Sequence, residues 1–431
     1  MMMPGPGVFD FLIVGGGLAA AAAVDGIREV DPTSTIGLIT EEAEPPYQRP
    51  PLSKEFLQYP DVPRSLLYVK PEGWFEEQER VELITRQKAL VLDPAAMSVT
   101  TARGNVFRAS RILIATGGRA RRIDRPGRDL EGVFTLRSVD DSEAIREGAV
   151  AGSRSVLIGA GFVGMELAAS LTAHDVASTV IETQDRVWAR ILPPDLSDWM
   201  RTHYEGKGVS FRLSSGVDRF IGHGKVEAVA VGAELLPCDL VVVGIGMDPC
   251  DGIARDAGLA VADGILVDTF GETSHPHIYA AGDVARFPDP VFDGHTRVEH
   301  WEHAREHGRL VGRNMAGERE PYELLSYFFS RVFDLNLNAV GRPALADETV
   351  VWGEPGEEPC AAFGLSEGRL CAVVLLDAPE ELEAGRALVR ERVSARLLED
   401  VTVRDMPSLR DLAQSVTGYQ NPDPGTGDLN E

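Results

Sequence analysis

The chain twice shows a short apolar run that ends in a glycine turn and leads into a helix-forming stretch. The first run is Phe11 to Val14, followed by Gly15 to Gly17 and an alanine-rich segment. The second is Ser155 to Ile158, followed by another glycine turn and a helical stretch from Met165 to Leu171. Branched residues that stop at glycines predict a buried strand, a tight turn and a helix. Two such starts, about 140 residues apart, predict two Rossmann-type α/β domains.

The pattern changes in the last quarter of the chain. From about Leu325, apolar and polar residues alternate with the period of a strand. We expect antiparallel strands at Phe328 to Val340 and at Ala361 to Leu376, the latter folded back at the turn Ser366 to Arg369. A helical run from Ala378 to Leu398 follows. The sequence therefore predicts a third domain of α+β type with an antiparallel sheet.

The amino-acid composition argues against several classes of protein. The 431 residues carry a net charge of −25 with 44% hydrophobic residues, which suits a folded protein and opposes binding to nucleic acid. Four widely spaced cysteines are too few for a disulfide framework or a zinc site and predict a reducing, cytoplasmic location. Three glycines and Asp10 interrupt the apolar stretch Val8 to Val24, so we expect neither a membrane span nor an export signal.

The first glycine turn has the spacing of a dinucleotide-binding site. Gly15 permits the turn, Gly17 lets the backbone approach a pyrophosphate, and Ala20 lets the helix pack on the strand. Glu41 ends the next strand, where an acid bonds ribose hydroxyls; the alternative is a solvated acid. A later strand ends at Gly282 and Asp283, where the acid would accept a hydrogen bond from a ribityl hydroxyl; a simple turn is the alternative.

The second glycine turn is the more complete of the two. Gly159, Gly161 and Gly164 match G-x-G-x-x-G, and Glu182 ends the following strand. An acid at that place bonds a free 2′-hydroxyl and repels a 2′-phosphate, so NADH is favoured over NADPH. Two arginines, Arg186 and Arg190, follow closely and offer a site for a phosphate instead.

Several motifs together resemble one family of flavoproteins. They are Pro45 to Glu55 (PPYQRPPLSKE), the segment Ala115 to Gly117, the two glycine turns, Tyr279 to Asp283, and Arg297 to Trp301. Together they resemble the FAD-dependent pyridine nucleotide oxidoreductases of the ferredoxin and rubredoxin reductase type, a group that includes monodehydroascorbate reductase and apoptosis-inducing factor. The resemblance covers about residues 8–376.

The resemblance implies a glutathione-reductase-like α/β fold with FAD and NADH as cofactors. The domains it implies are an FAD domain in two pieces, an inserted NAD domain, a C-terminal domain and a disordered tail: 1–122 with 251–324, 123–250, 325–416 and 417–431. Several further residues take roles through the resemblance alone: Arg49 and Lys54 reach FAD, Ala19 and Ala89 touch it through the backbone, Arg137 contacts its adenosine end, and Gly246 lines the nicotinamide side.

One motif of the wider fold is missing. Disulfide reductases carry a cysteine pair on the helix that faces the flavin, but Pro45 to Phe56 contains no cysteine, so electrons are expected to leave FAD directly. By resemblance, Lys54 and Glu166 form an ion pair near the flavin and act as catalytic residues. The alternative is a surface lysine and a helix-face acid.

Four more residues are expected to surround the flavin. A helix from His300 to Met315 would aim its N-terminal dipole at the flavin, with Glu299 and Trp301 beside it; packing and capping are the alternative roles. Phe329 stands where many relatives have a tryptophan against the flavin. Arg331 resembles the monodehydroascorbate reductase pattern, in which an arginine meets an anionic acceptor; an ion pair with Asp334 is the alternative.

The sequence leaves the electron acceptor open. The main hypothesis is an NADH-dependent reductase that passes single electrons to a ferredoxin or rubredoxin. The alternatives are a reductase of a small radical or quinone, and an NADH-sensing flavoprotein. Five arginines between the two α/β domains offer a basic patch for an acidic partner or form a plain linker: Arg119, Arg121, Arg122, Arg125 and Arg128. Both a monomer and a homodimer remain open.

Overall fold

The computed structural model describes residues 7–78, 80–356, 360–396 and 408–419. Backbone contacts divide the chain into two compact units. The first consists of Met1–Asp124, Glu131–Val150 and Val242–Leu324, and the second of Arg125–Leu130, Ala151–Val241 and Leu325–Glu431. Residues 131–150 and 242–250, which fall within the expected NAD domain, belong to the first unit.

A mainly parallel sheet forms the centre of the first unit. Its order is β3-β2-β1-β6-β5-β4, and β18 pairs with β6 as a further parallel strand. Residues Phe11 to Val14 of β1 are buried throughout, as expected of a parallel strand covered on both faces. The strands are β1 (Val8–Val14), β2 (Ile36–Ile39), β3 (Val81–Ile84), β4 (Ala89–Asp93), β5 (Ser98–Thr101), β6 (Val106–Ile114) and β18 (Ile278–Ala280).

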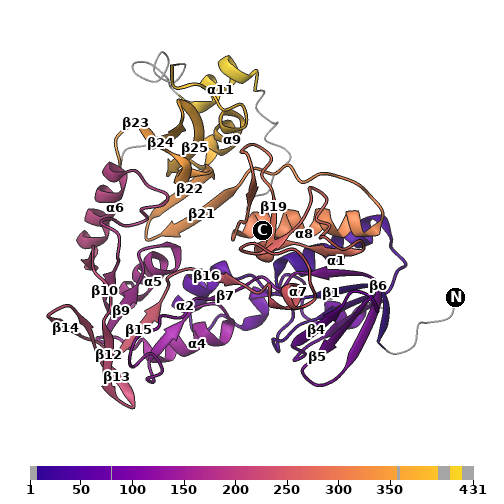
Figure 1. Cartoon of the computed structure of the whole chain (residues 1–431). Coiled ribbons are helices and arrows are strands. Elements are labelled where there is room, and N and C mark those ends of the chain that lie inside the picture. The colour runs from indigo at the N-terminus through magenta and orange to yellow at the C-terminus, as the bar shows by residue number, and fades with distance from the viewer. Residues whose placement is uncertain (1–6, 79, 357–359, 397–407, 420–431) are drawn as a thin grey trace. The chain divides into compact units, whose positions relative to one another are not determined.

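Two helices pack unusually closely in this unit. Figure 1 shows α8 (Trp301–Ala316) lying along α1 (Leu18–Val30). A Cβ atom at Gly312 would lie 2.3 Å from the carbonyl oxygen of Ala23, and one at Gly308 would lie 2.3 Å from that of Ala19. On α1, a Cβ atom at Gly26 would lie 2.0 Å from the carbonyl oxygen of Arg309. The two backbones are therefore in direct contact, and only glycine fits at these positions.

Shorter elements complete the first unit. The helices and turns are η1 (Pro50–Ser53), α2 (Glu55–Gln58), η2 (Arg64–Leu67), α3 (Trp74–Glu77), α4 (Val139–Gly148), α7 (Gly252–Asp256) and η3 (Gly282–Val284). The strands are β7 (Gly118–Ala120), β8 (Val133–Thr135), β16 (Met247–Pro249), β17 (Ile265–Leu266), β19 (Ala285–Pro288) and β20 (His295–Thr296). Antiparallel β7 and β16 lie together where the chain leaves this unit and returns to it.

The second unit contains a second parallel sheet, in the order β11-β10-β9-β15. An antiparallel sheet β12-β13-β14 follows in the sequence. The elements are β9 (Arg154–Ile158), α5 (Phe162–Thr172), β10 (Ala177–Ile181), α6 (Pro194–Gly206), β11 (Ser210–Arg212), β12 (Arg219–His223), β13 (Lys225–Val231), β14 (Glu234–Pro237) and β15 (Leu240–Val243).

The C-terminal part of this unit is an antiparallel sheet in the order β21-β22-β25-β24-β23. Glu367 and Gly368 join β24 to β25 with positive φ angles of 52° and 68°, the conformation that a two-residue hairpin turn favours. The expected turn from Ser366 to Arg369 is thus confirmed. The elements are β21 (Tyr327–Val332), β22 (Leu335–Gly341), η4 (Pro343–Leu345), β23 (Glu348–Trp352), β24 (Cys360–Ser366), β25 (Arg369–Leu376), η5 (Pro379–Glu381), α9 (Leu382–Arg390) and α11 (Leu409–Thr417).

The predicted fold class is confirmed: two Rossmann-type sheets and a C-terminal antiparallel sheet are present. The helix expected from His300 to Met315 is α8, with His300 as its N-cap. The helical run expected from Ala378 to Leu398 begins as η5 and α9 and is interrupted after Arg390, and its last two residues, 397–398, lie outside the described residues. The disorder expected at the C-terminus falls largely on residues 420–431, outside the described residues.

We predict that Gly312→Ala lowers the free energy of unfolding by about 1–3 kcal/mol, because overpacking would force α8 away from α1. The matched control is Gly252→Ala in α7, where a Cβ atom meets nothing within 4 Å. Chemical denaturation of both variants measures the difference. Equal stability of the two variants would contradict the close-packing argument.

Candidate functional site

The first glycine turn joins β1 to α1 and has the geometry of an anion site. Gly15 has a φ of 137°, and a Cβ atom there would lie 2.1 Å from the carbonyl oxygen of Ala115. A Cβ atom at Gly17 meets nothing within 4 Å, so a ligand has room there. Ala19 and Ala20 are buried in the first turn of α1. The free amides of this helix end suit a phosphate group.

The second chain segment of this site is the turn at Gly282, which follows β18. Its φ is 72°, and a Cβ atom there would lie 2.7 Å from the Cβ atom of Ala19. The amide of Gly282 donates to Nδ1 of the buried His307 over 3.3 Å. The close packing of α8 on α1 therefore brings Gly282 and Asp283 next to the first turn of α1.

Two largely buried arginines lie beside Asp283. Arg137 donates from Nη2 to Asp283 over 3.1 Å, and Arg49 donates to the backbone oxygen of Arg137. Burial and the neighbouring charge of Arg49 lower the pKa of Arg137. Nε of Arg137 is buried and has no hydrogen-bond partner among the described residues. An anionic ligand such as a pyrophosphate would relieve both the repulsion and the missing bond.

Arg49 is held in place by two residues that sequence reasoning missed. Glu42 accepts from Arg49 over 2.6 Å and from the hydroxyl of Tyr47 over 2.5 Å. The same hydroxyl accepts from the amide of Val139 over 3.1 Å. Burial raises the pKa of Tyr47, so its hydroxyl stays a donor. The only sequence signal was the position of Tyr47 inside the PPYQRPP motif.

Three other residues that were predicted to contact FAD belong to the first unit. Glu41 follows β2 and forms an exposed ion pair with Lys88 at 3.1 Å. Ala89 begins β4, one residue beyond Lys88. Lys54 lies between η1 and α2 and is partly buried. Contact of these residues with FAD stays a prediction.

The start of α8 contributes polar groups to the same unit. His300 caps the helix, and burial lowers its pKa to about 4, against the opposing charge of Asp283. Nε1 of Trp301 is buried without a hydrogen-bond partner among the described residues. Glu299 pairs with Arg297 at 2.5 Å. A neutral His300 and an unpaired indole N–H fit a polar ring system at this end of α8.

The second unit contains the second glycine turn. Gly159 has a φ of 103°, and a Cβ atom at Gly164 would lie 1.8 Å from the carbonyl oxygen of Gly159. Gly161 is open, since a Cβ atom there would meet nothing within 4 Å. Glu182 accepts from the amide of Ala160 over 2.7 Å, so its carboxylate lies against the turn. This is the arrangement of a ribose-binding acid beside a pyrophosphate site.

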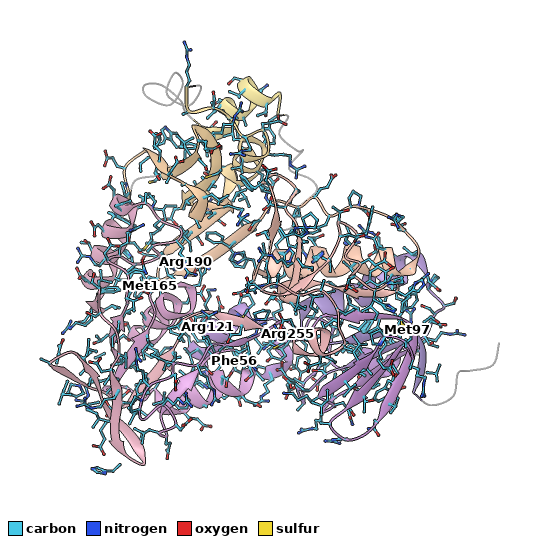
Figure 2. The ribbon with its side chains drawn as sticks, in the orientation of Figure 1. Phe56, Met97, Arg121, Met165, Arg190 and Arg255 are labelled. Atoms are coloured by element: carbon cyan, nitrogen blue, oxygen red, sulfur yellow. The ribbon has the colours of Figure 1, made fainter. Side chains whose placement is uncertain are left out.

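The other residues predicted for NAD binding fall in both units. Arg186 pairs with Asp185 at 3.1 Å. Arg190, labelled in Figure 2, is exposed in the loop before α6. Gly246 lies in the first unit, where its carbonyl oxygen accepts from the amide of Arg121 over 2.9 Å.

The arginine cluster is also divided between the units. Arg119, Arg121 and Arg122 belong to the first unit, and Arg125 and Arg128 to the second. Arg121 pairs with Asp248 at 3.0 Å, and Arg125 donates to a backbone oxygen over 2.8 Å. Local bonds of this kind favour the linker interpretation over a docking patch.

Strand β21 contains the remaining predicted residues. Phe329 is 40% exposed and stacks on Tyr327. Arg331 is exposed and makes no ion pair among the residues that the structure describes. The alternative pairing of Arg331 with Asp334 is wrong, because the positive φ of Phe333 turns the chain and Asp334 pairs with His203 at 3.3 Å and with Lys207 at 3.6 Å.

The predicted residues are thus divided between the two units, and we refer to each set as a half-site. The first unit contains Gly15, Gly17, Ala19, Ala20, Glu41, Arg49, Lys54, Ala89, Ala115, Gly117, Arg137, Gly246, Asp283, Glu299, His300 and Trp301. The second contains Gly159, Gly161, Gly164, Glu166, Glu182, Arg190, Phe329 and Arg331. In the first, a Cβ atom at Gly117 would lie 3.2 Å from Nη2 of Arg137, so the Ala115 to Gly117 motif reaches the arginine pair.

Comparison with known proteins agrees with this organisation. Residues 9–308 match the family described as pyridine nucleotide-disulphide oxidoreductase, and residues 327–413 match the reductase C-terminal family. The 5,5′-dehydrodivanillate O-demethylase ferredoxin reductase subunit of Sphingobium sp. is 35% identical over 88% of this chain and 93% of that protein.

Solved structures show the same fold. The covalent putidaredoxin reductase–putidaredoxin complex matches with a TM-score of 0.88 and 28% identity, covering 97% of this chain and 100% of that one. The ferredoxin reductase for the CYP199A2 system from Rhodopseudomonas palustris matches with a TM-score of 0.87 and 32% identity, covering 94% and 100%.

Two glycine turns of the dinucleotide-binding type, one in each unit, are typical of an oxidoreductase that uses two dinucleotides. The chain belongs to the pyridine nucleotide-disulphide oxidoreductase family, as an FAD-dependent NAD(P)H oxidoreductase of the ferredoxin reductase type. All four of its cysteines are free. Within the described part of the chain, no helix has the length and apolar character that a membrane span requires.

We predict that His303 makes the protein sensitive to acid. Burial lowers the pKa of His303 to about 4, against the charge of Asp283, and its ring packs on Phe287, His307 and Tyr322. The unfolded chain binds this proton near pH 6.5 and the folded chain does not, so stability is complete above pH 6.5 and is lost as the pH falls towards 4.

Between pH 6.5 and 4.5, His303→Gln should therefore reduce the fall in the free energy of unfolding by roughly 2 kcal/mol. Denaturant titration of the FAD-loaded protein across this range measures the effect. The control is His295→Gln, since His295 is exposed in β20. Parallel pH profiles for His303→Gln and the parent protein would contradict the prediction.

Proposed function

We propose that the protein is an NADH-dependent ferredoxin reductase. It takes a hydride from NADH onto FAD and passes the electrons one at a time to a ferredoxin- or rubredoxin-type protein. The observation that carries this proposal is the pair of half-sites, each with an open glycine turn and an acid placed beside it. The ferredoxin reductase names of the relatives support the acceptor class.

The electron balance follows from the cofactor. Bound FAD accepts two electrons together and releases them singly. One NADH, oxidised to NAD⁺ and a proton, therefore reduces two one-electron acceptors. The segment from Pro45 to Phe56 has no cysteine, and Cys238 and Cys250 are free with their thiol pKa values raised by burial. A raised pKa disfavours the thiolate, which supports direct electron exit without a disulfide relay.

In the first half-site, Arg49 and Arg137 would hold the FAD pyrophosphate together with the amides at the start of α1. Asp283 would accept from a ribityl hydroxyl. Trp301 would donate its indole N–H towards the flavin ring, where neutral His300 adds no charge of its own. These roles are supported by the unpaired buried donors Nε of Arg137 and Nε1 of Trp301.

In the second half-site, Glu182 would select NADH. Its carboxylate lies against Ala160 and also accepts from the amide of Gln184 over 2.8 Å, so it cannot swing away from a 2′-phosphate without losing two bonds. Arg186 is already paired with Asp185. Exposed Arg190 remains available to a phosphate.

A small anionic or radical acceptor is the second candidate function. Arg331 favours it, since this exposed arginine has no ion-pair partner among the described residues. We place either activity in the cytoplasm, on the ground of the four free cysteines.

The proposal is tested first by anaerobic stopped-flow mixing with NADH and then with NADPH. We expect the flavin band near ~450 nm to bleach within about one second with NADH, and far more slowly with NADPH. Reduced enzyme should then reduce a ferredoxin added in a second mix. Bleaching over minutes would instead indicate an NADH-sensing flavoprotein, and fast bleaching with transfer only to quinones or radicals would indicate the small-acceptor function.

Coenzyme preference has its own test in the same instrument. Glu182→Gln should lower the NADH over NADPH preference roughly tenfold, because it removes the charge that repels a 2′-phosphate. Exposed Asp195 in α6 provides the control variant Asp195→Asn, which removes a carboxylate charge elsewhere in the same unit. An unchanged preference in Glu182→Gln would remove Glu182 from the selective role.

We propose that Lys54 and Glu166 assist hydride transfer. A lysine cation would stabilise the negative charge that develops on the flavin, and the carboxylate of Glu166 would orient the nicotinamide. Lys54→Ala should slow flavin reduction by NADH roughly 10- to 100-fold. Exposed Lys225 in β13 provides the control variant Lys225→Ala. A normal reduction rate in Lys54→Ala would exclude the role.

A further inference from the structure

In the second unit, β21 turns one of its faces to α5. Its residues alternate between buried and more exposed from Phe328 to Val332. The ring of Phe328 meets that of Phe162 edge to face, with centroids 4.9 Å apart. Two residues along the strand, Ser330 donates from Oγ to Oε1 of Glu166 over 2.6 Å.

The bond between Ser330 and Glu166 is almost completely removed from solvent. Ser330 is 1% exposed and Glu166 is 7% exposed. A hydrogen bond to a carboxylate in such surroundings is stronger than one between neutral groups. Since no backbone feature requires a hydroxyl at this point of β21, the bond itself accounts for the serine.

A second hydroxyl holds the same turn of α5. Tyr204 in α6 donates to the backbone oxygen of Met165, the residue labelled in Figure 2 that precedes Glu166, over 3.2 Å. Burial, together with the charge of Glu166, raises the pKa of Tyr204. The backbone and the carboxylate of this turn are therefore each fixed by a hydroxyl from another element.

We propose that Ser330 is a positioning residue for NADH oxidation. By holding Oε1, it fixes the rotamer of Glu166, so that the carboxylate is already oriented when the nicotinamide arrives. The inference rests on the proposed function, in which Glu166 assists hydride transfer. It assigns to the C-terminal sheet a direct part in the NADH half-reaction, in addition to any part in contact with the acceptor.

The test compares three FAD-loaded, full-length variants with the parent protein. Ser330→Ala removes the hydroxyl, Ser330→Thr keeps it, and Ser155→Ala removes another buried serine hydroxyl, whose bond to Ser178 is 3.0 Å long and joins β9 to β10. Anaerobic stopped-flow at several NADH concentrations separates the limiting rate of flavin reduction from the NADH dissociation constant. Titration of photoreduced enzyme with NAD⁺ measures the long-wavelength charge-transfer band.

We expect Ser330→Ala to lower the limiting rate roughly five- to twentyfold, with the dissociation constant changed less than about twofold. The charge-transfer band should weaken, because a mobile carboxylate no longer fixes the nicotinamide. Ser330→Thr should recover most of the rate and the band, and Ser155→Ala should match the parent. Thermal unfolding of each variant checks that it is folded and holds FAD.

Two results would overturn the proposal. A folded, FAD-loaded Ser330→Ala variant with the parent's limiting rate and band would show that the hydroxyl is dispensable. A Ser330→Thr variant as slow as Ser330→Ala would show that side-chain volume, and not the hydroxyl, is what matters. Failure of the proposed function would look different: the parent protein itself would be reduced slowly by NADH or would not pass electrons to a ferredoxin.

Discussion

The first half-site depends on the direct backbone contact between α1 and α8. Glycines at 26, 308 and 312 leave no room for a side chain between the helices. This contact places Gly282 within van der Waals distance of Ala19, and so joins a turn near residue 282 to a turn near residue 17. It also fixes the direction of α8, whose first turn presents His300 and Trp301. If α1 and α8 were farther apart, the turn at residue 17, the turn at residue 282 and the start of α8 would no longer be held in fixed positions relative to one another.

Charge then decides what this half-site can bind. The charge of Arg49 contributes to the lowered pKa of Arg137, while Glu42 pairs with Arg49 and Asp283 pairs with Arg137. A buried Nε without a hydrogen-bond acceptor among the described residues is costly. The same group becomes favourable once an anion supplies the missing acceptor. On the proposed function, the diphosphate of FAD would supply this acceptor.

The features that sequence reasoning predicted are those with a local signature. Positive φ angles and close approach select glycine at Gly15 and Gly159, and the turn at Gly368 is equally local. The missed features join distant segments: Glu42 with Tyr47 against α4, the glycines of α8 against α1, and Ser330 with Glu166 across 164 positions. Closeness in sequence also suggested a wrong ion pair, between Arg331 and Asp334. The positive φ of Phe333 turns the chain, so that Asp334 pairs with His203 of α6 instead.

The two faces of strand β21 carry side chains with different proposed roles. Its inward residues, Phe328 and Ser330, pack on the helix that carries Glu166. Its outward residues, Phe329 and Arg331, are the ones assigned to the flavin and acceptor side. Because successive side chains of a strand point to opposite faces, a change at position 331 alters the surface offered to an acceptor without touching the buried bond to Glu166. On the proposed function, acceptor choice can therefore diverge while the chemistry of NADH oxidation stays the same.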